Sequence, residues 1–294
     1  MKRTVLVTGA TQGLGAAMVR ALDERTDFDV VLAVRDVGRG EAVAKTLRRP
    51  ARVMALDLSS LENVRRFAAA WNEPLFGLVN NAGVQHMTDT APTVDGYEET
   101  FAVNWLAVVE LTMALLPRLE GGRVMNIGSG THNPENKTAT RFGYRGGRFT
   151  SVAALARGES DGATAGQRAK DRYATSKLVV MAGTAALARR FPKTTFLTLD
   201  PGLMPGTGLA RGAPLLQRLA WSSVLKWVAP LLPDTSTPER SAIAAVGLLT
   251  GDFTSGGVYD FEQQPSRRLW KGTLDVELQE RIAQQTFSLL GVSA

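Results

Sequence analysis

The chain has 294 residues, a net charge of +6 and no cysteine. It can therefore form no disulfide, no thiolate metal site and no cysteine nucleophile, and its two histidines are too few for a multi-histidine metal cluster. The 34 basic side chains are spread along the chain, with no basic stripe typical of nucleic-acid binding. The excess of positive charge fits attraction to an anionic cofactor, and no metal is expected.

The organisation of the chain indicates one cytoplasmic domain. Its first residues run directly into a strand pattern and leave no room for a signal peptide. No uninterrupted apolar run reaches the ~18 residues of a membrane span, so we expect no membrane contact. No repeat, low-complexity tract or linker divides the sequence, and we predict a single domain over residues 1–294.

The first predicted strand, residues 4–8, leads into a glycine-rich turn. Gly9, Gly13 and Gly15 follow the strand with the spacing Gly-x3-Gly-x-Gly, and a helical stretch begins at residue 16. Glycines let the backbone turn tightly and approach a pyrophosphate, whose charge then lies at the helix N-terminus. Strand, turn and helix together predict a dinucleotide-binding site.

The second predicted strand, residues 29–34, ends at Arg35-Asp36. At this place a carboxylate selects the free 2′-hydroxyl of the adenosine ribose, whereas an arginine selects a 2′-phosphate. The strand closes with Val34 and Arg35 follows, which favours NADPH. Asp36 beside it leaves NADH open.

Apolar strand patterns alternate with helical patterns along the rest of the chain, which predicts a doubly wound α/β fold. We expect a mainly parallel, seven-stranded Rossmann-type sheet flanked by helices. The further strands are expected at 52–56, 76–79, 123–127, 195–199 and 257–261, with helices at 40–48, from 60, 98–119, 172–190, from 237 and 275–290.

A tyrosine and a lysine stand four residues apart, at Tyr173 and Lys177, on one face of the helix predicted at 172–190. The ammonium there can lower the pKa of the phenol, which is otherwise a poor acid at neutral pH. Tyr144 is a rival, but it lies among glycines and is followed four residues on by Arg148, which cannot give up a proton. Asn104, within an apolar helix, is either a structural brace or part of a site.

Two segments have patterns that do not specify a fold. Residues 131–170 contain many glycines and look mostly irregular, and we interpret them as an insertion beside the site. Residues 203–232 are apolar with interrupting charges, and we interpret them as a lid over an apolar substrate.

These motifs resemble the short-chain dehydrogenases/reductases, over about residues 3 to 262. The motifs, in the order found in that family, are Thr8-Gly9-x3-Gly13-x-Gly15, Asn80-Asn81-Ala82-Gly83, Asn104, Gly128-Ser129, Tyr173-x3-Lys177 and Pro201-Gly202. Within the family the chain is most similar to the NADPH-dependent branch of retinol dehydrogenases and protochlorophyllide reductases.

The resemblance implies hydride transfer between NADP(H), rather than NAD(H), and a hydrophobic aldehyde, ketone or matching alcohol. It implies Tyr173 as the general acid/base, Lys177 as the group that lowers its pKa and holds the nicotinamide ribose, and Ser129 as the oxyanion donor. Asn104 would order a proton path to Lys177. The implied cofactor-binding residues are Gly9, Thr11, Gln12, Gly13, Leu14, Gly15, Arg35, Asp57, Leu58, Asn81, Ala82, Gly83, Tyr173, Lys177, Pro201, Gly202, Met204 and Thr207.

The chain departs from the family pattern at two places. Ser129 precedes Tyr173 by 44 residues, so the fold must bring them together, and Thr207 stands one place later after Pro-Gly than in the family. A non-catalytic NADPH sensor or scaffold, and C=C reduction of a pigment-like substrate, are the alternatives. The absence of cysteine argues against the pigment, because pigment-reducing relatives commonly carry cysteines near the site. Homo-oligomer formation is left open.

Overall fold

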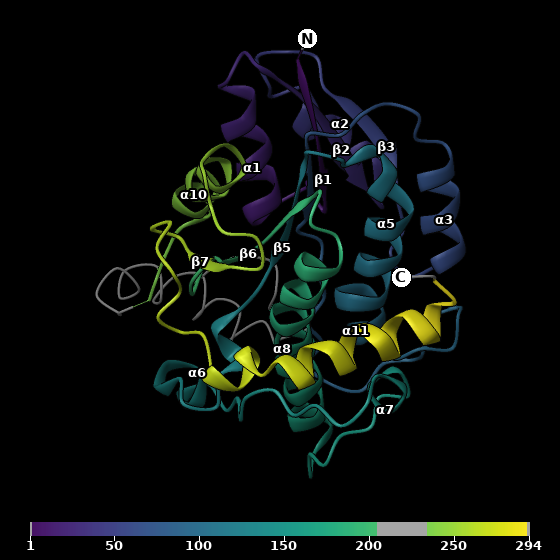
Figure 1. Cartoon of the computed structure of the whole chain (residues 1–294), viewed down its shortest axis with the longest axis vertical. Helices are drawn as coiled ribbons and strands as arrows, with labels where there is room; N and C mark the ends of the chain where they lie inside the picture. The colour runs from purple at the N-terminus through teal and green to yellow at the C-terminus, as the bar shows by residue number, and fades with distance from the viewer. Residues whose placement is uncertain (1, 205–233, 293–294) are drawn as a thin grey trace.

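A computed structural model, which describes residues 2–204 and 234–292, contains one sheet of seven parallel strands (Figure 1). The order across the sheet is β3-β2-β1-β4-β5-β6-β7. The predicted doubly wound sheet is therefore confirmed. The strands are β1 (Arg3–Thr8), β2 (Phe28–Val34), β3 (Arg52–Ala55), β4 (Gly77–Asn80), β5 (Arg123–Ile127), β6 (Thr195–Asp200) and β7 (Val258–Asp260).

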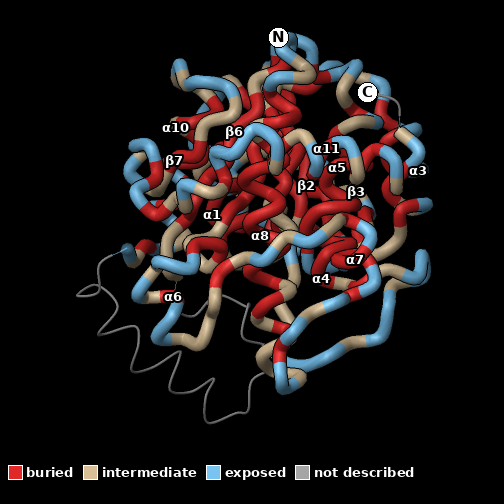
Figure 2. Tube along the Cα trace, turned by 60° about the horizontal axis from the view of Figure 1, so that its bottom comes forward, coloured by how far each residue is buried: buried red, intermediate tan, exposed pale blue. Residues whose placement is uncertain are grey.

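Successive side chains of a strand point to opposite faces of the sheet, and here both sets are apolar. Helices therefore cover both faces. Val5 and Val7 of β1 pack in the core cluster of α1, α2 and α10, whereas Leu6 packs in the cluster of α3, α5, α8 and α11. Figure 2 shows the sheet and the inner faces of these helices as one buried interior. The helix bounds are α1 (Gly13–Asp23), α2 (Val37–Ala44), α3 (Leu61–Ala69), α5 (Ala107–Leu115), α8 (Ala165–Arg190), α10 (Pro238–Thr250) and α11 (Val276–Leu290).

The strand order reverses between β1 and β4, and this places the site. Strand β1 pairs in parallel with β2 on one side and with β4 on the other. Val5 lies opposite Val30 of β2 and opposite Gly77 of β4. In an open α/β sheet, ligands bind beyond the carboxyl ends of the strands where the order reverses. The glycine turn after β1, the 80–83 loop after β4 and Ser129 after β5 all lie at this edge.

The prediction of a mostly irregular segment over 131–170 is wrong in part. It contains a 3-10 turn η3 (Gly130–His132) and the short helices α6 (Lys137–Arg141) and α7 (Val152–Ala156). Helix α8 begins at Ala165 rather than 172, because Thr164 caps it by accepting a hydrogen bond from Gln167 N at 3.1 Å. The predicted lid, apart from Leu203 and Met204, lies outside the described residues.

The helix expected at 98–119 is a composite of α4 (Glu99–Phe101), a π-helical turn η1 (Ala102–Leu106), α5 and a 3-10 turn η2 (Leu116–Arg118). Within the described part of the chain, the stretch Glu99–Arg118 is long and apolar enough to span a membrane by length and composition. However, 78% of the most apolar window of this stretch is buried inside the protein. Its apolar character is thus explained by packing in the core.

Helix α8 packs against both η1 and α11. Trp105 of η1 is fully buried, and its Nε1 donates a hydrogen bond to Thr286 Oγ1 of α11 at 2.8 Å. Gly183 of α8 faces the same indole, and a Cβ there would lie 2.2 Å from Trp105 Cη2. A glycine is therefore required at this contact.

We expect Gly183→Ala to lower the free energy of unfolding by about 1–3 kcal/mol, since the added methyl overpacks the Trp105 contact. Gly166→Ala in the same helix is the matched control, because its Cβ would meet only Met87 O at 3.5 Å. Urea unfolding followed by circular dichroism measures both. Equal urea midpoints for the two variants would show that the protein accommodates a methyl group beside Trp105 without loss of stability.

Candidate active site

The turn after β1 is held by the loop after β4. The Thr8 hydroxyl accepts hydrogen bonds from Asn81 N and Ala82 N, both at 3.0 Å, and Asn81 Nδ2 donates to Thr8 O at 2.9 Å. Gly9 has φ +65°, and a Cβ there would lie 2.8 Å from Ala82 Cα. A Cβ on Gly15 would lie 2.4 Å from Asn81 Nδ2. The two motifs thus form one interlocked unit that only glycine permits.

This unit fits the pyrophosphate of a dinucleotide. Helix α1 starts at Gly13 after an extended Gln12 that makes no side-chain capping bond, and its first turn holds no acidic residue. The first N–H groups of α1 are therefore available to an anion. Thr11, Gln12 and Gly13 are half-buried at the turn, whereas Leu14 and Gly15 are buried beneath it.

Two arginines lie near the end of β2, where a 2′-phosphate would bind. Arg35 is exposed, and its side chain forms no ion pair with any described residue. The Asp36 carboxylate caps α2 by accepting from Arg39 N at 3.0 Å, so it is engaged by the backbone. Arg39, which no sequence motif indicates, donates to Gln12 Oε1 at 3.3 Å. Its guanidinium therefore reaches the glycine turn.

The residues expected near the adenine follow β3. Asp57 Oδ1 accepts from Ser59 N at 3.0 Å and from Ser59 Oγ at 2.7 Å, and Leu58 is buried. The carboxylate thus fixes the turn that carries it. A contact with adenine stays a prediction for both residues.

Tyr173, Lys177 and Ser129 meet at the carboxyl edge of the sheet. Lys177 Nζ lies 5.7 Å from the centre of the Tyr173 ring and donates to Ile127 O at 2.8 Å. Ser129 lies close enough to Tyr173 to lower its pKa by hydrogen bonding. The fold therefore brings together the residues that 44 positions separate in the sequence. Ser129 Oγ also accepts from Thr131 Oγ1 at 3.0 Å.

Burial dominates the acidity of both groups on α8. Burial raises the pKa of Tyr173 above its ordinary value, the neighbouring Tyr144 raises it further, and Ser129 offsets part of the rise. Burial lowers the pKa of Lys177 to about 8. Lys177 is not among the causes of the Tyr173 shift, so a lowering of this pKa by the ammonium stays a prediction. Tyr173 is a neutral phenol, which suits a proton donor.

Asn104 braces the site from the π-helical turn η1. Its Oδ1 accepts from Val84 N at 2.8 Å, and its Nδ2 donates to Val84 O and to Ser176 Oγ, both at 3.0 Å. The structure therefore supports the brace interpretation. The brace also adjoins the site, since a Cβ on Gly83 would lie 3.1 Å from Asn104 Oδ1 and 3.8 Å from Lys177 Nζ. A proton path through Asn104 stays a prediction.

The remaining predicted cofactor residues follow β6. Gly202 has φ +79°, and Pro201 O accepts a hydrogen bond from Ser241 Oγ of α10 at 2.8 Å. Met204 is half-buried and packs against the core cluster of α1 and α10. This turn lies at the same sheet edge as Ser129. Thr207 lies outside the described residues.

Comparison with known proteins identifies the family of this chain. Residues 3–144 match the family model "short chain dehydrogenase". Protochlorophyllide reductase of Daucus carota is 30% identical over 99% of this chain and 79% of its own length. The chain belongs to the short-chain dehydrogenase/reductase family. It is thus an NAD(P)-dependent oxidoreductase.

Two further proteins are similar to this chain. Polyprenol dehydrogenase of Mus musculus is 41% identical over 145 residues, which cover 44% of this chain and 43% of the relative. The crystal structure of an uncharacterized protein from Mycobacterium Paratuberculosis matches with a TM-score of 0.71 and 27% identity, over 99% of this chain and 94% of that one. The likeness to this solved structure thus extends over nearly the whole chain.

His132, in the sequence Thr-His-Asn-Pro after Ser129, is a structural residue of this family member. Its Nδ1 lies 2.6 Å from Ser129 O, its Nε2 accepts from Trp270 N at 3.1 Å, and burial lowers its pKa. A neutral imidazole with both nitrogens engaged cannot act as a base. It instead links the Ser129 loop to the C-terminal segment.

Gln85 is a second residue that the sequence analysis did not select. It donates a hydrogen bond through Nε2 to the Tyr144 hydroxyl, and the Tyr144 ring lies 6.3 Å from that of Tyr173. The available signal was its position, two residues beyond the Asn80–Gly83 motif.

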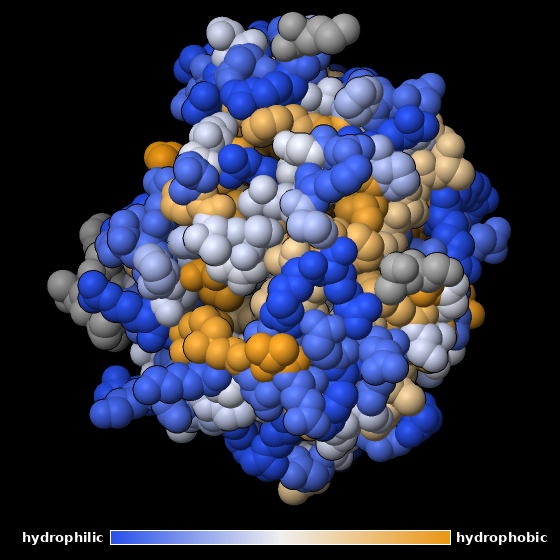
Figure 3. Space-filling model, in the orientation of Figure 1, coloured by the Kyte–Doolittle hydropathy of each residue, from blue (hydrophilic) through white to orange (hydrophobic). Residues whose placement is uncertain are grey.

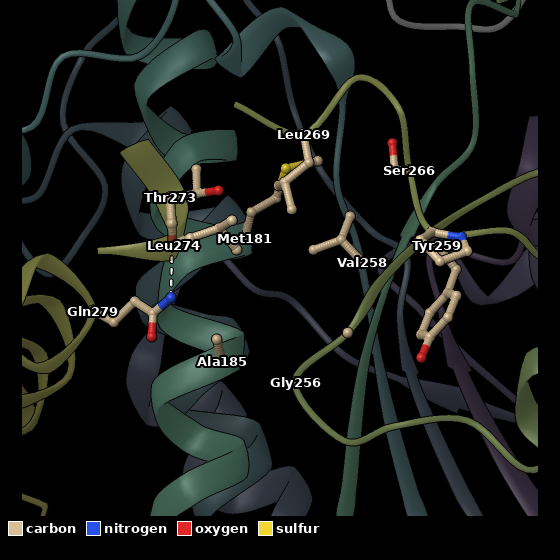
Figure 4. A pocket seen from close by; sticks show the side chains of 12 residues that line it. Met181, Ala185, Gly256, Val258, Tyr259, Ser266, Leu269, Thr273, Leu274 and Gln279 are labelled. Carbon is tan, nitrogen blue, oxygen red and sulfur yellow. Dashed lines mark hydrogen bonds between the residues drawn. The ribbon is translucent and has the colours of Figure 1, made fainter. Parts of the chain in front are cut away.

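A cavity of about 200 Å³ lies between α8, β7 and the residues before α11 (Figure 4). On the face shown in Figure 3, apolar side chains gather around a hollow near the middle. The cavity is lined by apolar side chains such as Met181, Val258 and Leu269, and Gln279 Nε2 donates to Thr273 O at 2.7 Å beside it. None of the predicted site residues lines it, so we assign the chemistry to the sheet edge.

The buried Lys177 should make stability depend on pH. Its folded pKa of about 8 lies below the ordinary 10.5, so between these values the unfolded chain holds more protons on this lysine than the folded protein does. Its contribution to stability therefore rises with pH across this window, by about 3 kcal/mol at most.

We expect Lys177→Met to be more stable than wild type at pH 7, and this advantage to shrink as the pH approaches 10. Denaturant unfolding of both proteins across this range measures the difference. Lys193→Met, at an exposed site, is the control and should show no such trend. A pH-independent difference for Lys177→Met would contradict the burial argument.

Proposed function

We propose that the chain reduces a hydrophobic aldehyde or ketone with NADPH, or oxidises the matching alcohol. The observation that carries this proposal is the meeting of Tyr173, Ser129 and Lys177 at the sheet edge, next to the glycine turn. The similarity to the protein named polyprenol dehydrogenase supports alcohol–carbonyl chemistry on an apolar substrate. A cytoplasmic location remains part of the proposal.

The mechanism assigns each group one task. When bound, the nicotinamide supplies or accepts the hydride. Ser129 donates a hydrogen bond to the substrate carbonyl oxygen, and Tyr173 gives its proton to the same oxygen as negative charge develops there. Lys177 keeps N–H donors beyond the one bonded to Ile127 O, and these can hold the nicotinamide ribose and stabilise a tyrosinate. The neutral form of Tyr173 is the one that donates a proton in the reductive direction.

The preference for NADPH rests on Arg35 and Arg39. Both are exposed at the carboxyl end of β2, and the Asp36 carboxylate beside them is engaged in capping α2. A 2′-phosphate would thus meet two guanidinium groups with little local repulsion.

Tyr173→Phe should lower kcat at least ~100-fold for every carbonyl substrate, since the proton donor is removed. NADPH affinity should remain within about twofold. NADPH oxidation against a panel of apolar aldehydes and ketones measures the first quantity, and NADPH fluorescence titration measures the second. Tyr97→Phe, which removes a hydroxyl on the loop before α4, is the control.

Two results would contradict the proposal. Wild-type turnover by the Tyr173→Phe variant would remove the tyrosine from the chemistry. Tight NADPH binding by the wild type without turnover on the panel would favour the sensor or scaffold.

Arg35→Ala and Arg39→Ala should each weaken NADPH binding about tenfold, because each removes a charge-assisted hydrogen bond to the 2′-phosphate. NADH binding should hardly change. Titration of both cofactors measures the ratio, and Arg20→Ala, an exposed residue of α1, is the control. An equal loss for both cofactors would place the arginines elsewhere in the site.

Reduction of a C=C bond in a pigment is the second candidate. Similarity over nearly the whole chain to protochlorophyllide reductases favours it, and the absence of cysteine weighs against it. Light-dependent reduction of protochlorophyllide by the purified protein would establish this function.

A further inference from the structure

Tyr144 lies beside the proposed acid and has no part in the mechanism above. The Tyr144 and Tyr173 rings are 6.3 Å apart and tilted by 54°. Burial raises the pKa of Tyr144, so its phenol stays protonated at neutral pH. Tyr144 is therefore suited to donate a hydrogen bond rather than to act as a base.

The Gln85 amide orients this hydroxyl. Its Nε2 donates to the Tyr144 oxygen, which leaves the phenol hydrogen for another acceptor. No described residue accepts that hydrogen. Gln85 itself follows the loop whose Gly83 faces Asn104 and Lys177. The open donor thus belongs to a ring that lies beside Tyr173.

The backbone around Tyr144 is fixed on both sides. Tyr144 N donates to Ala139 O at 3.2 Å, and Arg148 N donates to Thr175 Oγ1 of α8 at 3.0 Å. Between them Arg145 forms an ion pair with Asp171, which is buried two residues before Tyr173. One ion pair therefore joins the neighbour of Tyr144 to the turn of α8 that carries Tyr173.

We propose that the Tyr144 hydroxyl donates a hydrogen bond to a second oxygen of the substrate. The preferred substrate is then an apolar carbonyl compound that carries another acceptor oxygen a few bonds from the reacting carbonyl. This inference rests on the proposed function, because Tyr173 marks the reacting oxygen. Tyr144 is half-buried, and its hydroxyl is desolvated further when a substrate covers it. A desolvated donor left unpaired is costly, so a substrate that lacks the second oxygen binds less well.

The test uses ethyl benzoylacetate and hexanophenone, two aryl ketones of equal chain length, of which only the first has an ester carbonyl. Wild type should prefer the ketoester by about tenfold or more in kcat/KM, by the usual worth of a hydrogen bond in a desolvated site. Tyr144→Phe should raise KM for the ketoester by a similar factor with kcat retained, and leave hexanophenone within about twofold.

Matched variants separate recognition from folding. Gln85→Leu should shift the ketoester KM in the same direction, and Tyr97→Phe should change neither substrate. Tyr173→Phe should lose turnover on both substrates yet keep the binding preference. An equal loss on both ketones in Tyr144→Phe, or no loss on either, would overturn the proposal.

Isothermal titration calorimetry measures the binding of each ketone to the full chain in complex with NADP⁺. This readout does not depend on turnover. If wild type reduces neither ketone, the proposed reductase function fails for these compounds. Tighter binding of the ketoester that disappears in Tyr144→Phe would still support the second-oxygen contact. Equal affinities in the two proteins, or no binding of either ketone, would refute it.

Discussion

The buried ammonium of Lys177 is the constraint on which the site depends. Its side chain is only 7% exposed, and the only hydrogen bond that it makes with the described residues is to Ile127 O at 2.8 Å. A charge in such surroundings is costly and retains its proton only weakly, as its pKa of about 8 indicates. Gly83 lies close to this ammonium, since a Cβ there would be 3.8 Å from Lys177 Nζ, and its missing side chain leaves the neighbouring space open to a ligand. The buried ammonium thus costs stability, but it lies where it can donate hydrogen bonds to a bound ribose or stabilise a tyrosinate.

The C-terminal segment holds this arrangement in place. Arg268 forms a buried ion pair with Asp200 at the end of β6, with Nε 2.8 Å from Oδ2, and its backbone carbonyl accepts from Asn133 Nδ2 at 3.0 Å. Trp270 N donates to His132 in the loop that follows Ser129. Residues after β7 therefore connect the ends of β5 and β6, and α11 then closes over α8. Catalytic geometry in this chain depends on residues far from the family motifs in sequence.

Sequence patterns predicted the strands well because buried parallel strands are short apolar runs, as in residues 4–8 and 195–199. The glycine turn and the Tyr173/Lys177 pair were predicted because their chemistry requires fixed spacing. The predicted start of α8 is too late, because Gly158 and Gly162 indicate a loop in the sequence whereas Thr164 caps the helix in the structure. Arg39, Gln85 and the acidity of Tyr173 depend on contacts between segments far apart in the chain. Spacing along the sequence carries no information on such contacts.

The two adjacent tyrosines show how environment assigns roles to one residue type. Tyr173 stands on a rigid helix, with Ser129 beside its hydroxyl and Lys177 one turn away. Tyr144 stands on a loop, with only the neutral Gln85 amide at its oxygen. Two phenolates cannot form side by side in a buried site, and each ring raises the cost of ionising the other. Lys177 stands next to Tyr173 and not next to Tyr144, so the proposed mechanism assigns proton transfer to Tyr173 and hydrogen bonding to Tyr144.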